Sequence, residues 1–383
     1  MSLSILRILI PTSRKCKVTV YAHINTVPHG STGSLMMKEH YDLLKEGHDS
    51  YVFWGRGREA STEYEMKFCS DFEVKLDVLQ TRLDDRAGFH STVSTKRLLD
   101  RLDSIDPDVV HLHNLHGYYI NVQMLFNWLI GHHCRVEWTL HDCWAFTGHC
   151  AHFSYVGCQQ WKDEGCSKGC PQLDCYPKTY NKTNCSNNYL DKKELFTSIP
   201  HERMLLICPS MWLANLVRDS FLGKYRVAVR YNTIDRSVFR PIASDVKSKI
   251  GLAGKTMVLG VANPWTERKG LLDFFRLSRD LDNEKYGIVL VGLNEVQLKQ
   301  LPPGIIGIKR TESKEELAAM YSAADIFFNP TYEDNYPTVN LEAEACGTVV
   351  ITYDTGGCAE TIVDPRSKVV ATYEDALCEM IGK

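Results

Sequence analysis

Residues 329–347 read NPTYEDNYPTVNLEAEACG and follow a short apolar run. The polar loop ends at Pro337, which suits the first turn of a helix because proline lacks the amide hydrogen that would be unpaired there. We therefore predict a strand that ends at Asn329, then a polar loop, and then a helix over 338–345. The first amides and the positive dipole end of this helix favour a phosphate group. Glu342 shares a helix face with Thr338, and its carboxylate suits paired sugar hydroxyls. A solvated loop before an ordinary helix is the alternative.

Apolar runs alternate with amphipathic segments on both sides of this stretch. Short runs of even hydrophobicity are typical of parallel strands buried on both faces. The pattern occurs twice, with a seam near 231–245, and predicts two doubly wound α/β domains, 1–231 and 232–383. We expect strands over 17–23, 50–54, 108–113, 136–141, 204–208, 227–231, 257–262, 287–292, 305–309, 325–329 and 349–353, and helices over 34–46, 270–280, 314–323 and 338–345. The last helix is expected to pack back on the first domain. Ligands of such sheets bind at the carboxyl ends of the strands, so facing sheets predict an interdomain cleft.

The composition is that of an ordinary globular protein. The 383 residues include 44 Lys plus Arg and 47 Asp plus Glu, a formal charge of −3. This balance argues against a nucleic-acid-binding protein, whose domain pI typically exceeds about 9. No apolar stretch approaches the ~18 residues that a transmembrane helix needs. Arg7 interrupts the apolar N-terminus, which we interpret as a leader into the first strand. A cytoplasmic protein without a transmembrane segment is expected.

Half of the 14 cysteines lie between Cys143 and Cys185. This region, 143–188, has little periodicity and is predicted to be a Cys-rich insertion in the first domain. Four thiolates can hold a tetrahedral structural zinc ion, and glycines one or two residues before each candidate suit the turns required. The candidate ligands are Cys150, Cys158, Cys166 and Cys170; the alternative ligands are Cys143, Cys175, Cys185, His149 and His152. Free thiols or disulfides are the alternatives to a metal.

The stretch 329–347 resembles the E-x7-E signature of retaining glycosyltransferases of family 4, which have the GT-B fold of two facing Rossmann-like domains. The second half, EAEACG from Glu342, matches closely, and Asp334 takes the place of the first acid. The resemblance implies that Glu342 binds the ribose of a nucleotide and that Asp334 contacts the donor sugar, with Glu333 as the substitute. It also implies that the donor diphosphate is held by the loop and helix start at Tyr336, Pro337, Thr338 and Val339.

Further motifs occur in the order typical of that family. The segment VANPWTERKG, 261–270, resembles a loop whose cations neutralise the diphosphate, here Arg268 and Lys269. Fixed cations at this point stabilise the charge that develops on a leaving diphosphate. The segment YNTIDRSVFRP, 231–241, resembles an interdomain linker, and Gly356-Gly357-x-x-Glu360 resembles a turn after the next strand. Each motif is weak alone, but their order and spacing agree.

The first domain offers a glycine-rich loop and several histidines at strand ends. Gly30 and Gly33 flank a Ser-Thr pair before the helix expected at 34–46; the resemblance implies that this loop lines the donor site. It also implies that His113 faces the cleft near the reacting sugar, with His116 as the second candidate. A zinc pair of His111 and His113 is conceivable, but no third ligand is evident in the sequence nearby. His141-Asp142 is another cleft candidate, or a structural contact.

The sequence thus predicts a retaining glycosyltransferase that moves a hexosyl or related group from a nucleoside-diphosphate sugar. The expected acceptor is a saccharide or a lipid-linked saccharide, as in bacterial polysaccharide biosynthesis, with peripheral membrane contact at the inner face. His113, Lys269 and Asp334 are the expected catalytic residues, and catalysis needs no cofactor. The insertion is expected to shape acceptor choice without affecting donor binding. The alternatives are a GT-B nucleotide-sugar epimerase and a non-catalytic module that binds a sugar nucleotide or glycan.

Overall fold

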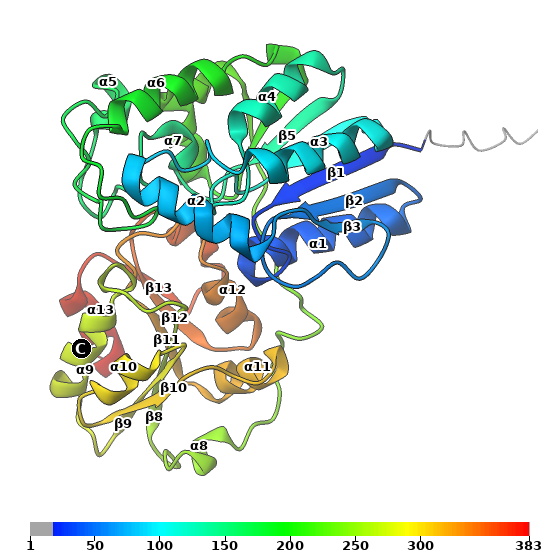
Figure 1. The fold of residues 1–383 in the computed structure, drawn as a ribbon. Coiled ribbons are helices and arrows are strands. Elements are labelled where there is room, and N and C mark those ends of the chain that lie inside the picture. The colour runs from blue at the N-terminus through cyan, green and yellow to red at the C-terminus, as the bar shows by residue number, and fades with distance from the viewer. Residues whose placement is uncertain (1–17, 383) are drawn as a thin grey trace, which may run out of the picture.

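A computed structural model describes residues 18–382, so the expected leader lies outside the described residues. Two all-parallel sheets, each covered by helices, lie one above the other in Figure 1. The seven-stranded sheet has the order β3-β2-β1-β4-β5-β6-β7, and the six-stranded sheet has the order β10-β9-β8-β11-β12-β13. This arrangement confirms the predicted α/β, GT-B architecture of two Rossmann-like domains. The chain passes between the sheets once, between Val229 and Thr256.

The strands lie close to the apolar runs of the sequence. The first sheet contains β1 (Val20–Asn25), β2 (Asp49–Trp54), β3 (Glu65–Lys67), β4 (Val109–Leu112), β5 (Arg135–Thr139), β6 (Met204–Cys208) and β7 (Arg226–Val229). The second contains β8 (Thr256–Val261), β9 (Tyr286–Val291), β10 (Ile305–Ile308), β11 (Ile326–Asn329), β12 (Val349–Tyr353) and β13 (Lys368–Val370). β3 and β13 were not predicted. Both are three-residue edge strands, too short to carry a pattern.

Helices connect the strands and cover both faces of each sheet. In the first domain these are α1 (Gly30–Lys45), α2 (Asp71–Asp84), α3 (Thr92–Ile105), α4 (Val122–Gly131), α5 (Gln160–Asp163), α6 (Cys185–Phe196) and α7 (Met211–Asp219). In the second they are α8 (Val246–Lys249), α9 (Leu271–Asp280), α10 (Glu295–Lys299), α11 (Lys314–Ala323), α12 (Thr338–Ala345) and α13 (Tyr373–Ile381). Among the described residues, no helix is long and apolar enough to cross a membrane.

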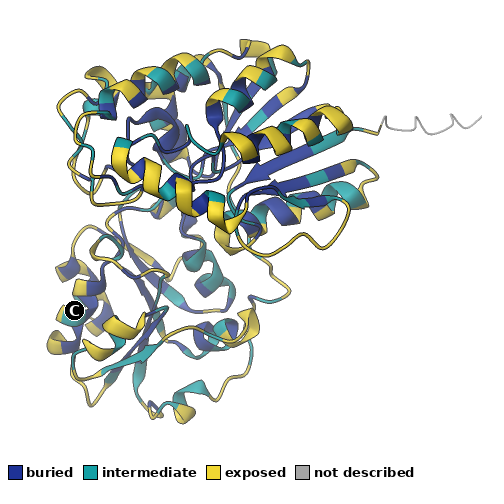
Figure 2. Ribbon diagram, in the orientation of Figure 1, coloured by how far each residue is buried: buried dark blue, intermediate teal, exposed yellow. Residues whose placement is uncertain are grey.

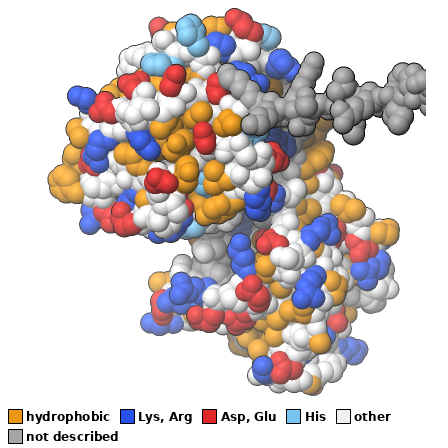
Figure 3. Space-filling model, turned by 90° about the vertical axis from the view of Figure 1, so that its right-hand side faces the viewer, with side chains coloured by type: hydrophobic (Ala, Val, Ile, Leu, Met, Phe, Trp, Pro, Cys, Tyr) orange, Lys and Arg blue, Asp and Glu red, His pale blue; other side chains and the backbone are white. Residues whose placement is uncertain are grey.

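The strands form the buried centre of each domain, as Figure 2 shows. In the second sheet, alternate residues enter two separate cores: Val258 and Phe328 lie in one, and Leu259 and Phe327 lie in the other. Successive side chains of a strand point to opposite faces, so a strand covered on both sides needs apolar residues at every position. Acidic and basic side chains are intermixed on the face drawn in Figure 3, in keeping with the near-neutral charge.

Two local expectations were wrong. The last helix, α13, was expected to pack on the first domain, but Tyr373, Ala376 and Met380 are buried in the core of the second. The Gly30–Gly33 segment was expected to be a loop before a helix at 34, but α1 already begins at Gly30. The glycine at 33 permits this early start, because a Cβ there would lie 2.5 Å from the carbonyl carbon of Pro28.

Candidate active site

The loop after β11 leads into a helix whose first turn has no capping side chain. α12 begins at Thr338, its N-cap is Pro337, and its first turn contains no acidic residue. The amides of Thr338 and Val339 therefore lie at an uncapped, positive helix end. Such an end binds anions through backbone N–H groups and the helix dipole. The predicted start of this helix is confirmed, and the geometry suits a phosphate group.

Two cations lie against the loop that precedes this helix. The ammonium of Lys269 forms an ion pair with the carboxylate of Asp334, and Arg268 Nη1 donates to the carbonyl oxygen of Glu333 at 2.5 Å. Burial opposes ionisation of Asp334, but Lys269 and Arg268 hold its pKa below the usual value. Gly270, in the left-handed region at φ 76°, ends this basic turn; a Cβ there would lie 2.2 Å from the carbonyl oxygen of Pro330. The structure thus brings Arg268, Lys269 and Asp334 together as predicted.

Glu342 lies in the second turn of the same helix and is mostly buried. Its Oε2 accepts a hydrogen bond from the Tyr321 hydroxyl at 3.1 Å. Burial raises the pKa of Glu342 to about 7, against the lowering effects of Tyr321 and Lys314. A partly protonated acid at neutral pH is poised to become an acceptor when a ligand supplies hydroxyl donors.

Glu333 has a role that the sequence did not reveal. Its side chain is fully buried, and its carboxylate accepts hydrogen bonds from three consecutive amides of the insertion. Oε1 lies 2.8 Å from the nitrogens of both Phe153 and Ser154, and Oε2 lies 3.2 Å from that of Tyr155. We call these three amides the insertion nest. Both oxygens of Glu333 are therefore occupied, which leaves Asp334 as the acid available for a ligand.

Gly356 and Gly357, which follow β12, pack against the loop that carries Asp334. The Gly357 amide donates to the carbonyl oxygen of Asp334 at 3.0 Å. A Cβ at Gly356 would lie 1.9 Å from the carbonyl oxygen of Asp334, and one at Gly357 would lie 1.9 Å from that of Asn335. Neither position can carry a side chain while the loop keeps its place. Close packing against the backbone of Asp334 and Asn335 therefore explains both glycines of the G-G-x-x-E motif.

Further hydrogen bonds join the loop to the first domain. Asn335 accepts from the Ser210 hydroxyl at 2.6 Å and donates to the carbonyl oxygen of His141 at 3.0 Å. The carboxylate of Glu360 accepts from the amides of Met211 and Trp212, the first residues of α7, at 2.6 and 2.8 Å. The second acid-bearing motif thus caps a helix of the other domain, and the two domains are held together beside Asp334.

His113 follows β4 and lies at a cavity of about 340 Å³, which is lined by Leu35, Lys38, Glu39, Asp42, Leu43, Glu46, His113, Thr139, His141, Ile207, Arg230, Tyr231, Asn232 and Thr233. Its Nδ1 lies 3.2 Å from His141 Nε2, while its own Nε2 has no partner in the part of the chain that the structure describes. Burial, followed by the charges of neighbouring histidines, holds the pKa of His113 well below its usual value, so the ring is neutral. His116 instead contacts Asp142 and the Tyr176 hydroxyl, at 2.7 and 2.8 Å.

The structure adds two possible metal ligands, His23 and Glu39, to the pair of His111 and His113. One candidate ligand atom each from His23, Glu39, His111 and His113 lies within 4.8 Å of the others. His111 already bonds Glu39 at 3.1 Å and the Thr139 hydroxyl at 2.8 Å, whereas both ring nitrogens of His23 lack a partner among residues 18–382. His23 comes from β1 and Glu39 from α1, so only the sheet order brings them beside β4.

The cysteines of the insertion gather around a second, very small cavity. All four predicted ligands line this cavity, together with Cys185. Cys185 contacts both Cys166 and Cys170, and Cys150 contacts Cys170. Every cysteine among residues 18–382 is a free thiol. Cys185 was only an alternative ligand in the sequence; it lies 15 positions after Cys170, at the start of α6.

Comparisons with known proteins agree with the fold and with the family resemblance of the second domain. Residues 245–379 match the family model described as glycosyl transferases group 1. The chain is 24% identical over 364 residues to the putative colanic acid biosynthesis glycosyl transferase WcaC of Escherichia coli (strain K12), with 90% of this chain and 85% of that protein covered. Sucrose-phosphate synthase from Thermosynechococcus elongatus has a TM-score of 0.68 at 13% identity, with 95% of this chain and 89% of that chain covered. Anabaena HepE in complex with UDP and glucose has a TM-score of 0.59 at 12% identity, with 95% and 88% covered.

Fold and site together define a GT-B glycosyltransferase. The match to the group 1 glycosyl transferases lies in the second domain, and the similarity to WcaC extends over 90% of the chain.

Proposed function

We propose that the protein transfers a sugar from a nucleoside-diphosphate sugar to a saccharide acceptor, with retention of the anomeric configuration. The observation that carries this proposal is the convergence of Arg268, Lys269 and the uncapped start of α12 on the loop that bears Asp334. A diphosphate needs cations and free amides, and a sugar needs a carboxylate beside them. Retention is supported by the resemblance of the Asp334–Glu342 motif to the retaining family.

Donor binding would rearrange one contact of the free protein. Lys269 and Asp334 neutralise each other in the structure. A bound donor would offer phosphate oxygens to Lys269 and sugar hydroxyls to Asp334, so each side chain exchanges one partner for another. The ionised carboxylate of Glu342 would accept hydrogen bonds from the two ribose hydroxyls. The residues proposed to bind the donor would thus exchange partners without leaving Lys269 or Asp334 unpaired.

The proposed chemical step is a front-face substitution. The acceptor hydroxyl oxygen bonds to the anomeric carbon on the face from which the diphosphate oxygen departs. The electron pair of the broken bond goes to the diphosphate, which takes the acceptor's proton. Arg268, Lys269 and the α12 amides stabilise the departing charge, an effect of about 10²–10³ in rate for one well-placed donor. We expect that transfer requires no added metal ion, because these groups meet the charge.

His113 would act by hydrogen bonding rather than as an acid or base. Its ring is neutral and fully buried, and its Nε2 has no partner among the described residues. With Nδ1 held by His141, Nε2 is the nitrogen left to form a hydrogen bond with a sugar hydroxyl. A neutral imidazole orients a hydroxyl without competing with the diphosphate for the proton. His113 is therefore proposed to position the reacting sugar.

The acceptor side is proposed from the names of relatives. WcaC is named for colanic acid biosynthesis, and a Campylobacter jejuni relative, 30% identical over 176 residues, is named as a transferase acting on a diphospho-undecaprenol saccharide. We propose a saccharide or lipid-linked saccharide acceptor. A lipid-linked acceptor would place the enzyme at the inner face of the membrane during turnover.

The first experiment is a thermal-shift panel with UDP, GDP, ADP, CDP and their common sugar conjugates. Ligand at ~100 times its dissociation constant adds about 2.7 kcal/mol to the native state. Turnover with the donor thus identified is then followed by NMR of the anomeric proton, which reports retention directly. Lys269→Ala and Glu342→Ala should each lower turnover severely while the protein stays folded, and near-normal activity of both would refute this site. Donor conversion without an acceptor would indicate an epimerase, and binding without any turnover would indicate a binding module.

A further inference from the structure

The insertion holds five thiols around one cavity of about 10 Å³, which has room for a single ion or water molecule. Their positions along the chain are Cys150, Cys158, Cys166, Cys170 and Cys185. The thiols meet in pairs: Cys150 with Cys170, Cys170 with Cys185, and Cys185 with Cys166. Cys158 lies on the more exposed side of the same cavity. Five unbridged thiols around one small cavity call for a physical reason.

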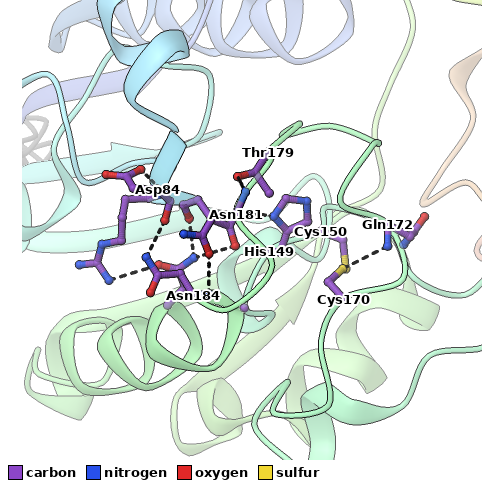
Figure 4. Close-up of polar contacts among 12 residues, drawn as sticks. Asp84, His149, Cys150, Cys170, Gln172, Thr179, Asn181 and Asn184 are labelled. Carbon is purple, nitrogen blue, oxygen red and sulfur yellow. Dashed lines mark hydrogen bonds and ion pairs between the residues drawn. The ribbon is translucent and has the colours of Figure 1, made fainter. Parts of the chain in front are cut away.

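The backbone around the sulfurs is shaped for acceptors. The Gly148 amide donates to Cys166 Sγ at 3.3 Å, and the Gln172 amide donates to Cys170 Sγ at 3.4 Å; Figure 4 shows the second contact. A Cβ at Gly148 would lie 2.1 Å from the carbonyl oxygen of Cys185, so only glycine lets these segments meet. Backbone N–H groups aimed at sulfur stabilise thiolates, as the outer contacts of metal sites do.

A buried lysine, Lys192, lies beside the cysteine cluster. Lys192 is 1% exposed, and its ammonium is held by the carbonyl oxygens of Trp144 and Thr147 at 3.0 and 3.1 Å. Cys150, Cys166 and Cys185 are all near enough to act on its charge, as is Asp85. Among the described residues, no carboxylate forms an ion pair with Lys192 at contact distance. Asp85 contributes negative charge near this buried side chain, and metal-bound thiolates would contribute more than neutral thiols do.

His149 lines the same cavity and has a free nitrogen. Its Nδ1 contacts the buried carboxylate of Asp85 at 2.5 Å, while its Nε2 is buried and has no partner among the described residues. Figure 4 shows the ring beside Cys150. A histidine fixed by a carboxylate at one nitrogen and open at the other is the arrangement found around metal ions. This orphaned atom is a second, independent sign that the cavity is built for a ligand.

We propose that this cluster binds one zinc ion, with Cys150, Cys166 and Cys170 as common ligands and Cys185, Cys158 or His149 as the fourth. Four such ligands, with thiolates at about 2.3 Å, satisfy tetrahedral zinc and leave no open position, so the ion is structural. The structure thereby revises the predicted ligand set, because Cys185 joins the candidates on contact rather than on spacing.

The metal would fix the insertion nest. Phe153, Ser154 and Tyr155 lie between Cys150 and Cys158, so the chain that grips Glu333 is anchored on both sides by the cluster. Zinc would hold these amides at the spacing that the Glu333 carboxylate requires. This positioning role rests on the proposed function, whereas the metal site does not.

The test begins with zinc content, measured by elemental analysis of full-length protein purified without chelators or added zinc. We expect about one zinc per chain for a site of this kind. Replacement of Cys150, Cys166 or Cys170 by serine should remove most of it, and Cys175→Ser, an exposed cysteine of the same insertion, should not. Loss in only one of Cys158→Ser and Cys185→Ser supports the proposal and names the fourth ligand, and loss in neither of these two names His149. Retention in every one of these variants would overturn it.

Cobalt substitution separates this site from the His23, Glu39, His111 and His113 group. Cobalt held by thiolates gives a strong sulfur-to-metal charge-transfer absorption, which nitrogen and oxygen ligands do not give. We expect this band in the wild-type protein and its loss in Cys170→Ser. Folded wild-type protein with well under one metal equivalent would overturn the proposal, as would a mass decrease showing disulfides between these cysteines. Neither result depends on transferase activity, so failure of the metal site and failure of the proposed function can be told apart.

Discussion

Glu342→Gln should make the protein more stable at high pH and weaken nucleotide binding. Burial raises the pKa of Glu342 from 4.5 to about 7 in the folded protein. Between these two values the unfolded chain releases a proton that the folded chain retains, so stability falls as pH rises. With 1.36 kcal/mol per pKa unit, the penalty is about 1 kcal/mol at pH 5 and about 3 kcal/mol at pH 8. Glutamine has the same shape, keeps an acceptor for Tyr321 and never carries the charge.

The assay is urea unfolding of both proteins at pH 5 and pH 8. The variant should gain about 2 kcal/mol more at pH 8 than at pH 5, and Glu284→Gln, at an exposed loop position, should show no such difference. The same substitution removes the carboxylate that would accept ribose hydroxyls, so nucleotide affinity should fall about tenfold to a hundredfold. An equal change in stability at both pH values, or a variant less stable at pH 8, would refute the reasoning.

Three further outcomes are expected. Nucleotide affinity of the wild-type protein should rise about tenfold from pH 6 to pH 8, since the ionised fraction of an acid with pKa 7 rises by that factor, and a flat titration curve would contradict the role of Glu342. Glu333→Gln should lower stability by about 3 kcal/mol in urea unfolding, because an amide cannot serve three buried N–H donors; an unchanged midpoint would show that the insertion nest contributes nothing. Gly357→Ala should lower both stability and turnover, since its Cβ would lie 1.9 Å from the carbonyl oxygen of Asn335, whereas Gly131→Ala has open space and should behave as wild type in both assays.

The sequence predicted the parts of the fold that repeat a local physical signal. Strands buried on both faces need apolar residues at every position, so β6 and β12 were found at their observed bounds. Helix α12 was also found at its bounds, because proline and the following pattern mark its start. The edge strands β3 and β13 have only three residues each, and their place depends on pairing with β2 and β12. A three-residue segment is too short for its sequence to indicate which strand it pairs with.

The site was predictable where motifs of the resembled family contain its parts, and less so where only the fold brings those parts together. Lys269 and Asp334 come from two motifs that the resemblance had already placed together, and they meet. Glu333 could not be interpreted from its own neighbourhood, because its partners lie about 180 positions away in the insertion. The same holds for His23, which joins His111 only through the pairing of β1 with β4. Long-range contacts of buried polar groups follow from sheet order, which spacing along the chain does not contain.

The adjacent acids Glu333 and Asp334 change what should be expected of the insertion. Asp334 faces Lys269 in its own domain, whereas Glu333 is held by the insertion nest of the other. The sequence suggested that trimming the insertion would alter acceptor use alone. In the structure, its removal strips three N–H donors from a fully buried carboxylate. An unpaired buried charge costs several kcal/mol, so the loop would shift and carry Asp334 with it. Acceptor choice must therefore be tested with substitutions that leave residues 153–155 and the cysteine cluster in place, because any larger deletion disturbs the donor side as well.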